Sequence, residues 1–178
     1  MSFVTKFYTG DTHFGHASVI DHCQRPFADV RQMDEAMISN WNAAVRDDDL
    51  VFHVGDFAMN LGDESRVREI FGRLRGRKRL ILGNHDLDRK GNVHSTIAAL
   101  DWDARPEHAA ETKDGGQRIY LNHYAGRTWP AAHHGSYHFF GHSHGKMPAL
   151  GRSRDVGVDV ADVGFRPRTF GELTECML

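Results

Sequence analysis

The sequence has few of the features that mark membrane proteins or secreted disulfide-bonded proteins. No apolar run in its 178 residues approaches the roughly 20 residues that a membrane helix needs. Its two cysteines, Cys23 and Cys176, lie far apart without neighbours that indicate a metal knuckle or redox pair, so we expect reduced thiols. The first residues lack a basic start followed by a long apolar stretch, so we expect no secretory signal. These absences favour a cytoplasmic protein with no membrane partner.

An excess of positive charge is also lacking. Lysine and arginine total 22 against 24 aspartate and glutamate residues, which gives a formal net charge of -2. This balance argues against a dedicated polyanion-binding surface. Residues 73–79 form the one dense basic run, which could follow a nucleic-acid backbone. Cations at a helix C-terminus before a buried strand are the alternative, and the net charge favours this alternative.

The first half of the chain alternates strand patterns with helix patterns. Apolar or aromatic runs predict strands, and apolar residues at helical spacing predict helices between them. Such alternation predicts parallel strands joined by crossover helices. The expected strands are residues 3–9, 50–54 and 79–82; the expected helices run from 33 to about 45 and over 67–74, the latter with Asp63 or Ser65 as its N-cap and Gly76 after its end.

The second half is rich in strand patterns and has little helical periodicity. Gly115-Gly116 separates residues 109–112 from residues 118–122, which predicts a hairpin. Residues 137–140 and 154–160 are further expected strands. No linker, repeat or low-complexity segment divides the halves, so we expect a single domain over residues 1–178 that buries a core without disulfides.

Histidine is abundant, with 13 copies, and five short motifs contain histidine, aspartate or asparagine. These motifs are residues 11–13, 55–56, 83–86, 122–123 and 141–144. Each motif follows a short apolar run, so we expect it at the carboxyl end of a strand, where open α/β sheets bind ligands. Histidine is the commonest metal ligand, and burying such a cluster without a cation would be unfavourable. The candidate metal ligands are Asp11, His13, Asp56, Asn84, His123, His142 and His144.

The candidate ligands combine imidazoles with oxygen donors and include no thiolate. Such a set suits manganese, iron, zinc or nickel better than it suits a structural cysteine-rich zinc site. Only Asp11 and Asp56 carry negative charge, so two divalent ions leave a local excess of about +2, suited to a hydroxide and a phosphate oxyanion. A single ion would be neutralised and overligated. We therefore expect two divalent ions, with Mn²⁺ preferred and Fe, Zn or Ni as alternatives.

The series Asp-x-His, Gly-Asp, Gly-Asn-His-Asp, His and Gly-His-x-His resembles the calcineurin-like metallophosphoesterases. The five motifs span residues 11–144 and stand in the family's order. The resemblance implies an α/β (α+β) fold, a four-layer αββα sandwich of two mixed β-sheets flanked by helices, with the dimetal site at the sheet edge. It also implies that Asp11, His13 and His144 hold the first ion, that Asn84, His123 and His142 hold the second, and that Asp56 bridges them.

The resemblance further implies hydrolysis of a phosphate ester. A hydroxide between the ions would attack phosphorus, while His85 would contact the phosphate and protonate the leaving group, with Asp86 as its orienter. A diester is preferred over a monoester because no segment is long enough to form a cap domain. A nucleotide or nucleic-acid-derived substrate stays open, as does the oligomeric state. The rival function is a catalytically silent metal-binding scaffold on the same fold.

Two features bear on the branch of the family and on substrate contacts. The residues after Asp56 lack the acid–arginine pair of the protein serine/threonine phosphatases, so we do not expect that activity. His16 is an added histidine in the first motif, similar to a small bacterial and phage-type branch; it would contact substrate from the rim or cap the following helix. Three arginines are candidates to hold a phosphate oxygen, with solvated surface as the alternative: Arg127, Arg152 and Arg154.

Overall fold

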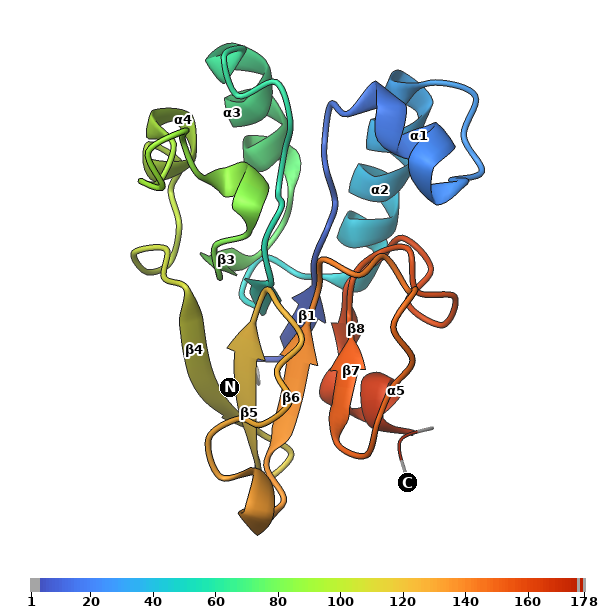
Figure 1. Cartoon of the computed structure of the whole chain (residues 1–178). Helices are drawn as coiled ribbons and strands as arrows, with labels where there is room; N and C mark the ends of the chain where they lie inside the picture. Colours follow the sequence, from blue (N-terminus) through green and yellow to red (C-terminus); the bar gives the residue numbers. More distant parts are fainter. Residues whose placement is uncertain (1–3, 176, 178) are drawn as a thin grey trace.

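The computed structural model describes residues 4–175 and 177, which form two four-stranded β-sheets (Figure 1). The first sheet has the strand order β3-β2-β1-β8. Its strands β1, β2 and β3 are parallel, whereas β8 runs antiparallel to β1. The bounds of these strands are β1 (Lys6–Thr9), β2 (Leu50–His53), β3 (Arg77–Leu80) and β8 (Arg168–Thr169).

The second sheet has the strand order β4-β5-β6-β7. The predicted hairpin is confirmed as the antiparallel pair β4–β5, and β5, β6 and β7 are parallel to one another. Both sheets are therefore mixed, as predicted. The bounds are β4 (Ala109–Asp114), β5 (Gln117–Asn122), β6 (Tyr137–Phe140) and β7 (Ser153–Asp155).

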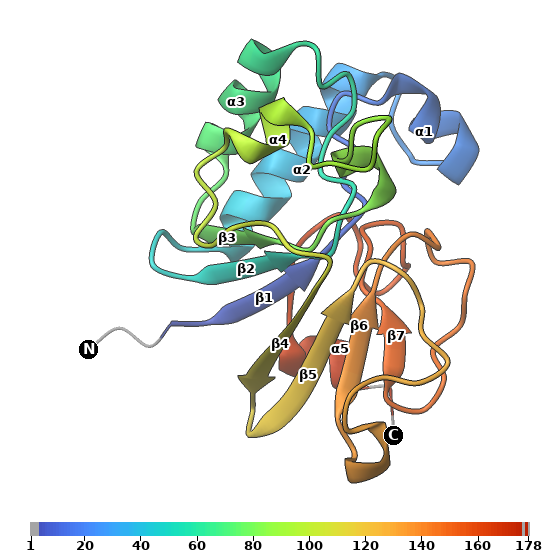
Figure 2. The same cartoon turned by 60° about the vertical axis from the view of Figure 1, so that its left-hand side comes forward.

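Helices flank the pair of sheets, which confirms the predicted sandwich architecture. The helices that precede β4 in the chain cover the outer face of the first sheet (Figure 2). No helix in the described part of the chain is long and apolar enough to cross a membrane. The helices are α1 (Ala17–Cys23), α2 (Val30–Ala44), α3 (Glu64–Arg73), α4 (Ser95–Ala98) and α5 (Phe170–Thr174), with the short 3-10 helices η1 (Asn84–Asp86) and η2 (Ala132–His134).

Each of the two long helices has an N-capping aspartate and apolar residues at helical spacing. The Asp29 carboxylate accepts a hydrogen bond from the Gln32 N–H at 2.8 Å and so caps α2. Asp63 caps α3 in the same way, which decides between the two predicted N-caps. Each helix buries one apolar face against the first sheet: Met33, Met37, Ile38 and Trp41 on α2, and Val67, Ile70 and Phe71 on α3.

The core divides into one cluster under the helices and one between the sheets. Strand β2 contributes to both, because Val51 faces the helices whereas Phe52 faces the second sheet. Burial on both faces explains why this strand reads as a continuous apolar run. Phe139 of the second sheet packs edge-on against Tyr8 of the first, with ring centroids 5.1 Å apart.

Two predicted strands differ most from those observed. Strand β3 spans Arg77–Leu80 instead of the predicted residues 79–82, because Arg77 and Lys78 also pair with β2. The buried Lys78 ammonium donates to the backbone carbonyls of Leu74 and Gly76. The predicted strand 154–160 is wrong beyond Asp155, whose carboxylate accepts the Gly157 N–H at 2.7 Å and turns the chain. The sequence patterns also did not predict α4, α5 or β8.

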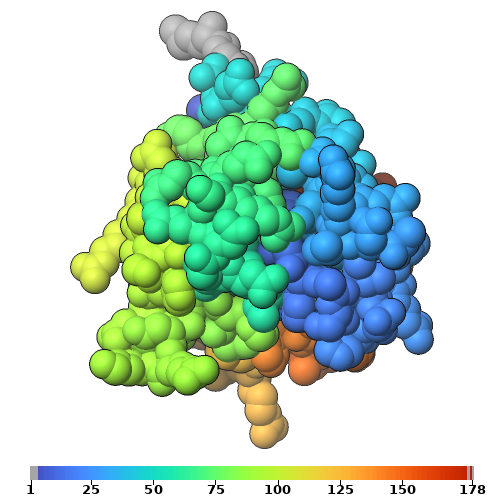
Figure 3. All heavy atoms as spheres, turned by 90° about the horizontal axis from the view of Figure 1, so that it is seen from above, coloured from blue at the N-terminus to red at the C-terminus, as the bar shows by residue number. Residues whose placement is uncertain are grey.

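The basic run 73–79 is engaged within the fold, as the favoured alternative predicted. Arg73 pairs with Glu35 across a polar groove of about 790 Å³ between α2 and α3. Figure 3 shows this region from above, where green atoms of α3 meet blue atoms of α1 and α2. Arg77 and Arg79 both pair with Asp103. These ion pairs leave little charge free for a polyanion. Of the two cysteines, Cys23 is a free thiol, and Cys176 lies outside the described residues.

Candidate metal centre

The five predicted motifs follow the carboxyl ends of β1, β2, β3, β5 and β6. Backbone hydrogen bonds join the loops, including Asp11 N–H to Gly55 O at 2.9 Å and Gly141 N–H to His123 O at 3.0 Å. The His142 N–H also donates to both carboxylate oxygens of Asp11, at 3.0 and 2.9 Å. The loops of the two sheets therefore meet at one place.

The backbone at this place is strained. Five of the seven predicted metal ligands adopt the left-handed region, with φ between 49° and 65°. Residues other than glycine seldom adopt such angles, which are unfavourable by about 1–3 kcal/mol each and cluster at functional sites. The surrounding hydrogen bonds hold this conformation. The five are Asp11, His13, Asp56, His142 and His144.

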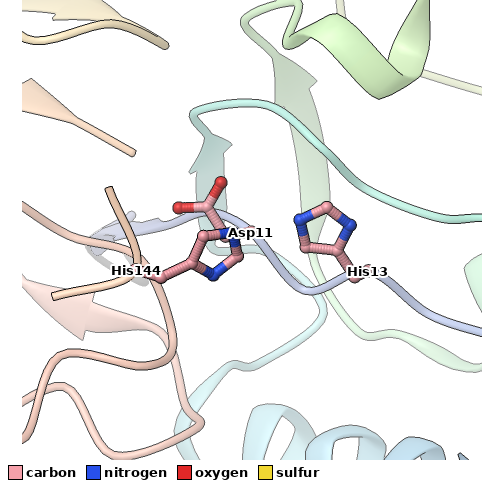
Figure 4. Close-up of side chains that lie close together, drawn as sticks. All are labelled: Asp11, His13 and His144. Carbon is pink, nitrogen blue, oxygen red and sulfur yellow. The ribbon is translucent and has the colours of Figure 1, made fainter. Parts of the chain in front are cut away.

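One group of ligand atoms comes from the loops after β1 and β6. Asp11, His13 and His144 each offer an atom, and these atoms lie within 4.8 Å of one another. Figure 4 shows the three side chains close together, with Asp11 and His13 on the blue segment and His144 on an orange loop. Both ring nitrogens of His13 are buried and find no hydrogen-bond partner among the described residues. Burying them unpartnered is unfavourable, so the group fits a cation.

A second group consists of Asp56, His123 and His142, again with ligand atoms within 4.8 Å of one another. Asn84 joins it, because its Oδ1 lies 3.2 Å from Nε2 of His123. Asp56 connects the two groups: its Oδ2 lies 3.5 Å from Nε2 of His13 and 3.5 Å from Nε2 of His123. One carboxylate oxygen thus stands between a histidine of each group, as a bridging ligand would.

Hydrogen bonds set the orientation of two histidine rings. Nδ1 of His123 donates to Val54 O at 2.7 Å, and Nδ1 of His144 donates to Asp159 Oδ2 at 2.7 Å. In the neutral imidazole, a proton on Nδ1 leaves the Nε2 lone pair free for a metal. Asp159 in turn accepts two hydrogen bonds from Arg25, each of 2.8 Å.

Arg25 and Asp159 were missed by the sequence reasoning. The guanidinium of Arg25 is buried and also donates to the backbone carbonyls of Asp11, at 2.7 Å, and Thr12, at 2.9 Å. It therefore ties the first ligand loop to the residue that orients His144. Neither residue stands in a recognisable motif, and they are far apart in sequence, so nothing local in the sequence indicated this pair.

The acid–base properties of the buried groups show where protons compete with a cation. Burial raises the pKa of the Asp11 carboxyl to about 7, and the neighbouring Asp155 and Asp56 carboxylates add to the rise against the opposing effect of His123 and His144. Burial lowers the pKa of His13 to about 2. Burial also acts to raise the pKa of Asp56, but hydrogen bonds and the charge of His123 outweigh it and hold this pKa low. Burial acts to lower the pKa of His123, but the hydrogen bond and the charge of Asp56 outweigh it and raise this pKa to about 9. Protons on Asp11 and His123 therefore compete with a metal, which binds an ionised carboxylate and neutral imidazoles.

His85 lies within the site, next to the proposed bridge. Its backbone N–H donates to Asp56 Oδ1 at 2.8 Å, and its ring centroid is 5.1 Å from that of His13. His85 also offers a ligand atom within 4.8 Å of those of His13 and Asp56. The ring therefore has a place beside the ligands of both groups.

Asp86 was expected to orient the His85 ring, but its carboxylate has other partners. Its carboxylate accepts the N–H groups of Asp56 at 2.8 Å, Phe57 at 3.1 Å and Gly83 at 2.8 Å. Among the described residues its hydrogen bonds go to the backbone rather than to the His85 ring. Burial raises the pKa of this carboxyl to about 6. We therefore correct its role: Asp86 holds the loop that carries Asp56.

The remaining histidine candidates separate into rim and core. His16 occupies the N-cap position of α1 without a capping hydrogen bond, and its ring centroid lies 5.3 Å from that of His13, at the rim. His53 is fully buried, with Nε2 at 2.9 Å from Thr12 Oγ1, as predicted for a core histidine.

The three candidate arginines also differ from one another. Arg154 is buried and pairs with Asp162, whereas Arg152 donates to Gly135 O at 2.7 Å. Both guanidinium groups are therefore engaged by the protein itself. Arg127 is exposed and lines a groove beside β6, so it is the one of the three that faces solvent.

Comparison with known proteins gives partial sequence matches. The chain is 41% identical to the uncharacterized protein MJ1445 of Methanocaldococcus jannaschii over an aligned segment of 86 residues. This segment covers 48% of this chain and 49% of that protein. It is 36% identical to the Gene 66 protein of Mycobacterium phage L5 over an aligned segment of 81 residues. This segment covers 44% of this chain and 38% of that protein. The matches thus span half or less of these curated relatives. None of the known family models matches the chain.

Solved structures match over most of the chain. A protein of unknown function from Aquifex aeolicus, AQ665, superposes with a TM-score of 0.71 and 21% identity over 97% of this chain and 99% of its own. An archaeal phosphodiesterase superposes with a TM-score of 0.50 and 16% identity over 86% of this chain and 82% of its own. The chain therefore shares its fold with these two solved structures. Within this fold, the predicted ligands lie at the loops where the two sheets meet.

Proposed function

We propose that this protein is a metal-dependent phosphoesterase that uses two divalent ions. The observation that carries the proposal is the position of Asp56 Oδ2, 3.5 Å from one histidine of each ligand group. Two ions sharing a carboxylate can be held about 3.5–4 Å apart, the spacing that suits displacement at phosphorus. The unpartnered nitrogens of His13 support the same proposal, because a cation would satisfy one of them.

The residues have distinct proposed roles. Asp11, His13 and His144 would hold one ion, Asn84, His123 and His142 the other, and Asp56 both. When bound, the ions would lower the pKa of a water molecule and stabilise negative charge on the phosphate. His85 would contact the phosphate and donate a proton to the departing oxygen, since its backbone bond to Asp56 keeps it beside the ligands. His16 would contact substrate from the rim.

A phosphodiester is the preferred substrate class. Asn84 and His142 are exposed, whereas Asp11 and His13 are buried, so substrate would approach from the side of Asn84 and His142. The structural likeness to an archaeal phosphodiesterase is consistent with this preference. Mn²⁺ is the proposed ion, and a nucleotide or nucleic-acid-derived ester falls within the proposed class. The cytoplasmic location stays a prediction.

Metal analysis together with turnover tests the proposal. Purified protein supplemented with manganese should contain about two ions per chain. It should hydrolyse bis(4-nitrophenyl) phosphate faster than 4-nitrophenyl phosphate. The protein could instead bind two ions and hydrolyse neither of these esters, nor alkyl or cyclic esters. This result would support the metal-binding scaffold. Faster hydrolysis of the monoester would leave the enzyme class standing and contradict the diester preference.

A further inference from the structure

Exposed apolar side chains gather on two loops that begin at the candidate metal ligands. Among the described residues, four large apolar side chains are exposed, and three of them are Tyr124, Met147 and Leu150, at 50%, 46% and 82% exposure. Tyr124 directly follows His123, and the other two follow His144. The fourth, Val4, lies at the start of the described chain, before β1. A clustered apolar surface of this kind marks a binding site.

The two loops form the walls of a groove of about 500 Å³. This volume lies within the usual range for sites that bind small organic molecules. The indole of Trp129 is held in place: its ring stacks on the buried His138 ring at 5.3 Å, and its Nε1 donates to Ser136 O at 3.1 Å. The groove is lined chiefly by Ala125, Arg127, Trp129, Phe140, Met147 and Leu150.

The groove lies beside the candidate metal ligands along the chain: its lining residues Ala125 and Phe140 are two residues away from His123 and His142, respectively. The Tyr124 ring lies 4.7 Å from the His142 ring and 4.9 Å from the His123 ring, and its hydroxyl is 3.5 Å from Asn84 Oδ1. Met147 stands three residues after His144, so chain geometry limits their Cα separation to about 11 Å. A molecule held by its phosphate at the metal centre can therefore extend an organic group into the groove.

We propose that this groove binds an aromatic ring carried by the phosphate-ester substrate. The inference rests on the proposed function and adds the chemical class of the ester group. The indole of Trp129 offers a fixed aromatic surface, and a methionine thioether makes favourable contacts with rings. Transfer of a ring from water into this apolar groove is favourable through the hydrophobic effect. A methyl ester is too small to fill the groove and would gain little from it.

Binding of two phosphonates tests the inference without any need for turnover. Isothermal titration calorimetry on the full manganese-loaded chain would compare phenylphosphonate with methylphosphonate. We expect phenylphosphonate to bind at least tenfold more tightly. The double variant M147S/L150S should lose this preference and keep its affinity for methylphosphonate, because both side chains are exposed and neither is a proposed ligand. The matched control V4S removes a side chain of 48% exposure outside the groove and should keep the preference.

The outcomes that would overturn the inference differ in what they imply for the phosphoesterase proposal. Equal affinities for both phosphonates, or a preference that persists in M147S/L150S, would exclude the groove and leave the phosphoesterase proposal standing. A change in sedimentation of M147S/L150S with no change in phosphonate preference would assign the surface to contacts between copies. Failure of both phosphonates to bind would overturn the phosphate site and this inference together.

Discussion

Asp159 accepts a hydrogen bond from Nδ1 of His144 at 2.7 Å while it is held by two hydrogen bonds from the buried guanidinium of Arg25. The carboxylate fixes the ring so that Nε2 is directed away from it. Arg25 also holds the Asp11 carbonyl, so one cation positions two ligands that come from different sheets. Residues that orient ligands in this way control metal affinity although they do not contact the metal.

Asp159→Asn should therefore weaken metal binding. The substitution keeps the shape of the side chain but removes the charge that pairs with Arg25, so we expect about a 10- to 100-fold loss of affinity for one of the two ions. Manganese titration followed by electron paramagnetic resonance measures this. Asp162→Asn is the control, because Asp162 pairs with Arg154 instead. Unchanged titration curves in Asp159→Asn would contradict the positioning role.

Asp56 should matter for both ions. If its carboxylate bridges them, Asp56→Asn lowers the occupancy of both sites, whereas His144→Ala mainly empties one. Elemental analysis of the purified variants gives the ratio of metal to protein. About one metal per wild-type chain, unchanged by added manganese, would count strongly against two ions.

The effect of replacing His85 on the rate of hydrolysis should depend on the leaving group of the ester. A group that protonates the departing oxygen matters most for a poor leaving group such as an alkoxide and least for nitrophenolate. His85→Asn should keep both metals and lose more rate on an alkyl ester than on a nitrophenyl ester. The measurement is kcat on matched esters together with metal content. Equal loss on both esters would indicate stabilisation of charge on the phosphate, and loss of metal would make His85 a ligand.

Acid should destabilise the fold partly through His138. Burial lowers the pKa of this imidazole from 6.5 to about 4, against a smaller opposing effect of the Tyr124 backbone. Between these pH values the unfolded chain binds a proton that the folded chain does not, so the contribution of His138 to stability is complete above pH 6.5 and falls as the pH drops toward 4. The loss is roughly 3 kcal/mol in size.

Urea denaturation of wild type and His138→Phe at pH 7 and pH 4.5 measures this effect. The variant cannot take up the proton, so its free energy of unfolding should fall less between the two pH values. Its absolute stability at pH 7 is not the readout, because the variant also loses the contact with Ser153. Identical losses in the two proteins would mean that other buried groups account for the acid sensitivity.

The sequence predicted those parts of the site that depend on strand ends. Asp11 and Asp56 follow neighbouring parallel strands, whose carboxyl ends lie at one edge of the first sheet. Helix α3 was likewise predictable, because Asp63 caps it and its apolar spacing is regular. These features depend on residues that are close together in the sequence, so sequence patterns can predict them.

Other parts depend on contacts between distant residues. Arg25 meets Asp159 across 134 positions of sequence, and neither residue carries a local signal. Asp86 stands beside His85 in the sequence, yet its carboxylate turns to three backbone N–H groups. The ammonium of Lys78 enters the core because backbone carbonyls receive it. Each arrangement follows from tertiary packing, which the pattern of residue types does not encode.

The bond from the His142 N–H to the Asp11 carboxylate joins the loops of the two sheets. Asp11, His13, Asp56 and Asn84 follow strands of the first sheet, whereas His123, His142 and His144 follow strands of the second. The proposed ions would therefore bind only where both sheets are in contact. Bound ions would in turn hold the two sheets together.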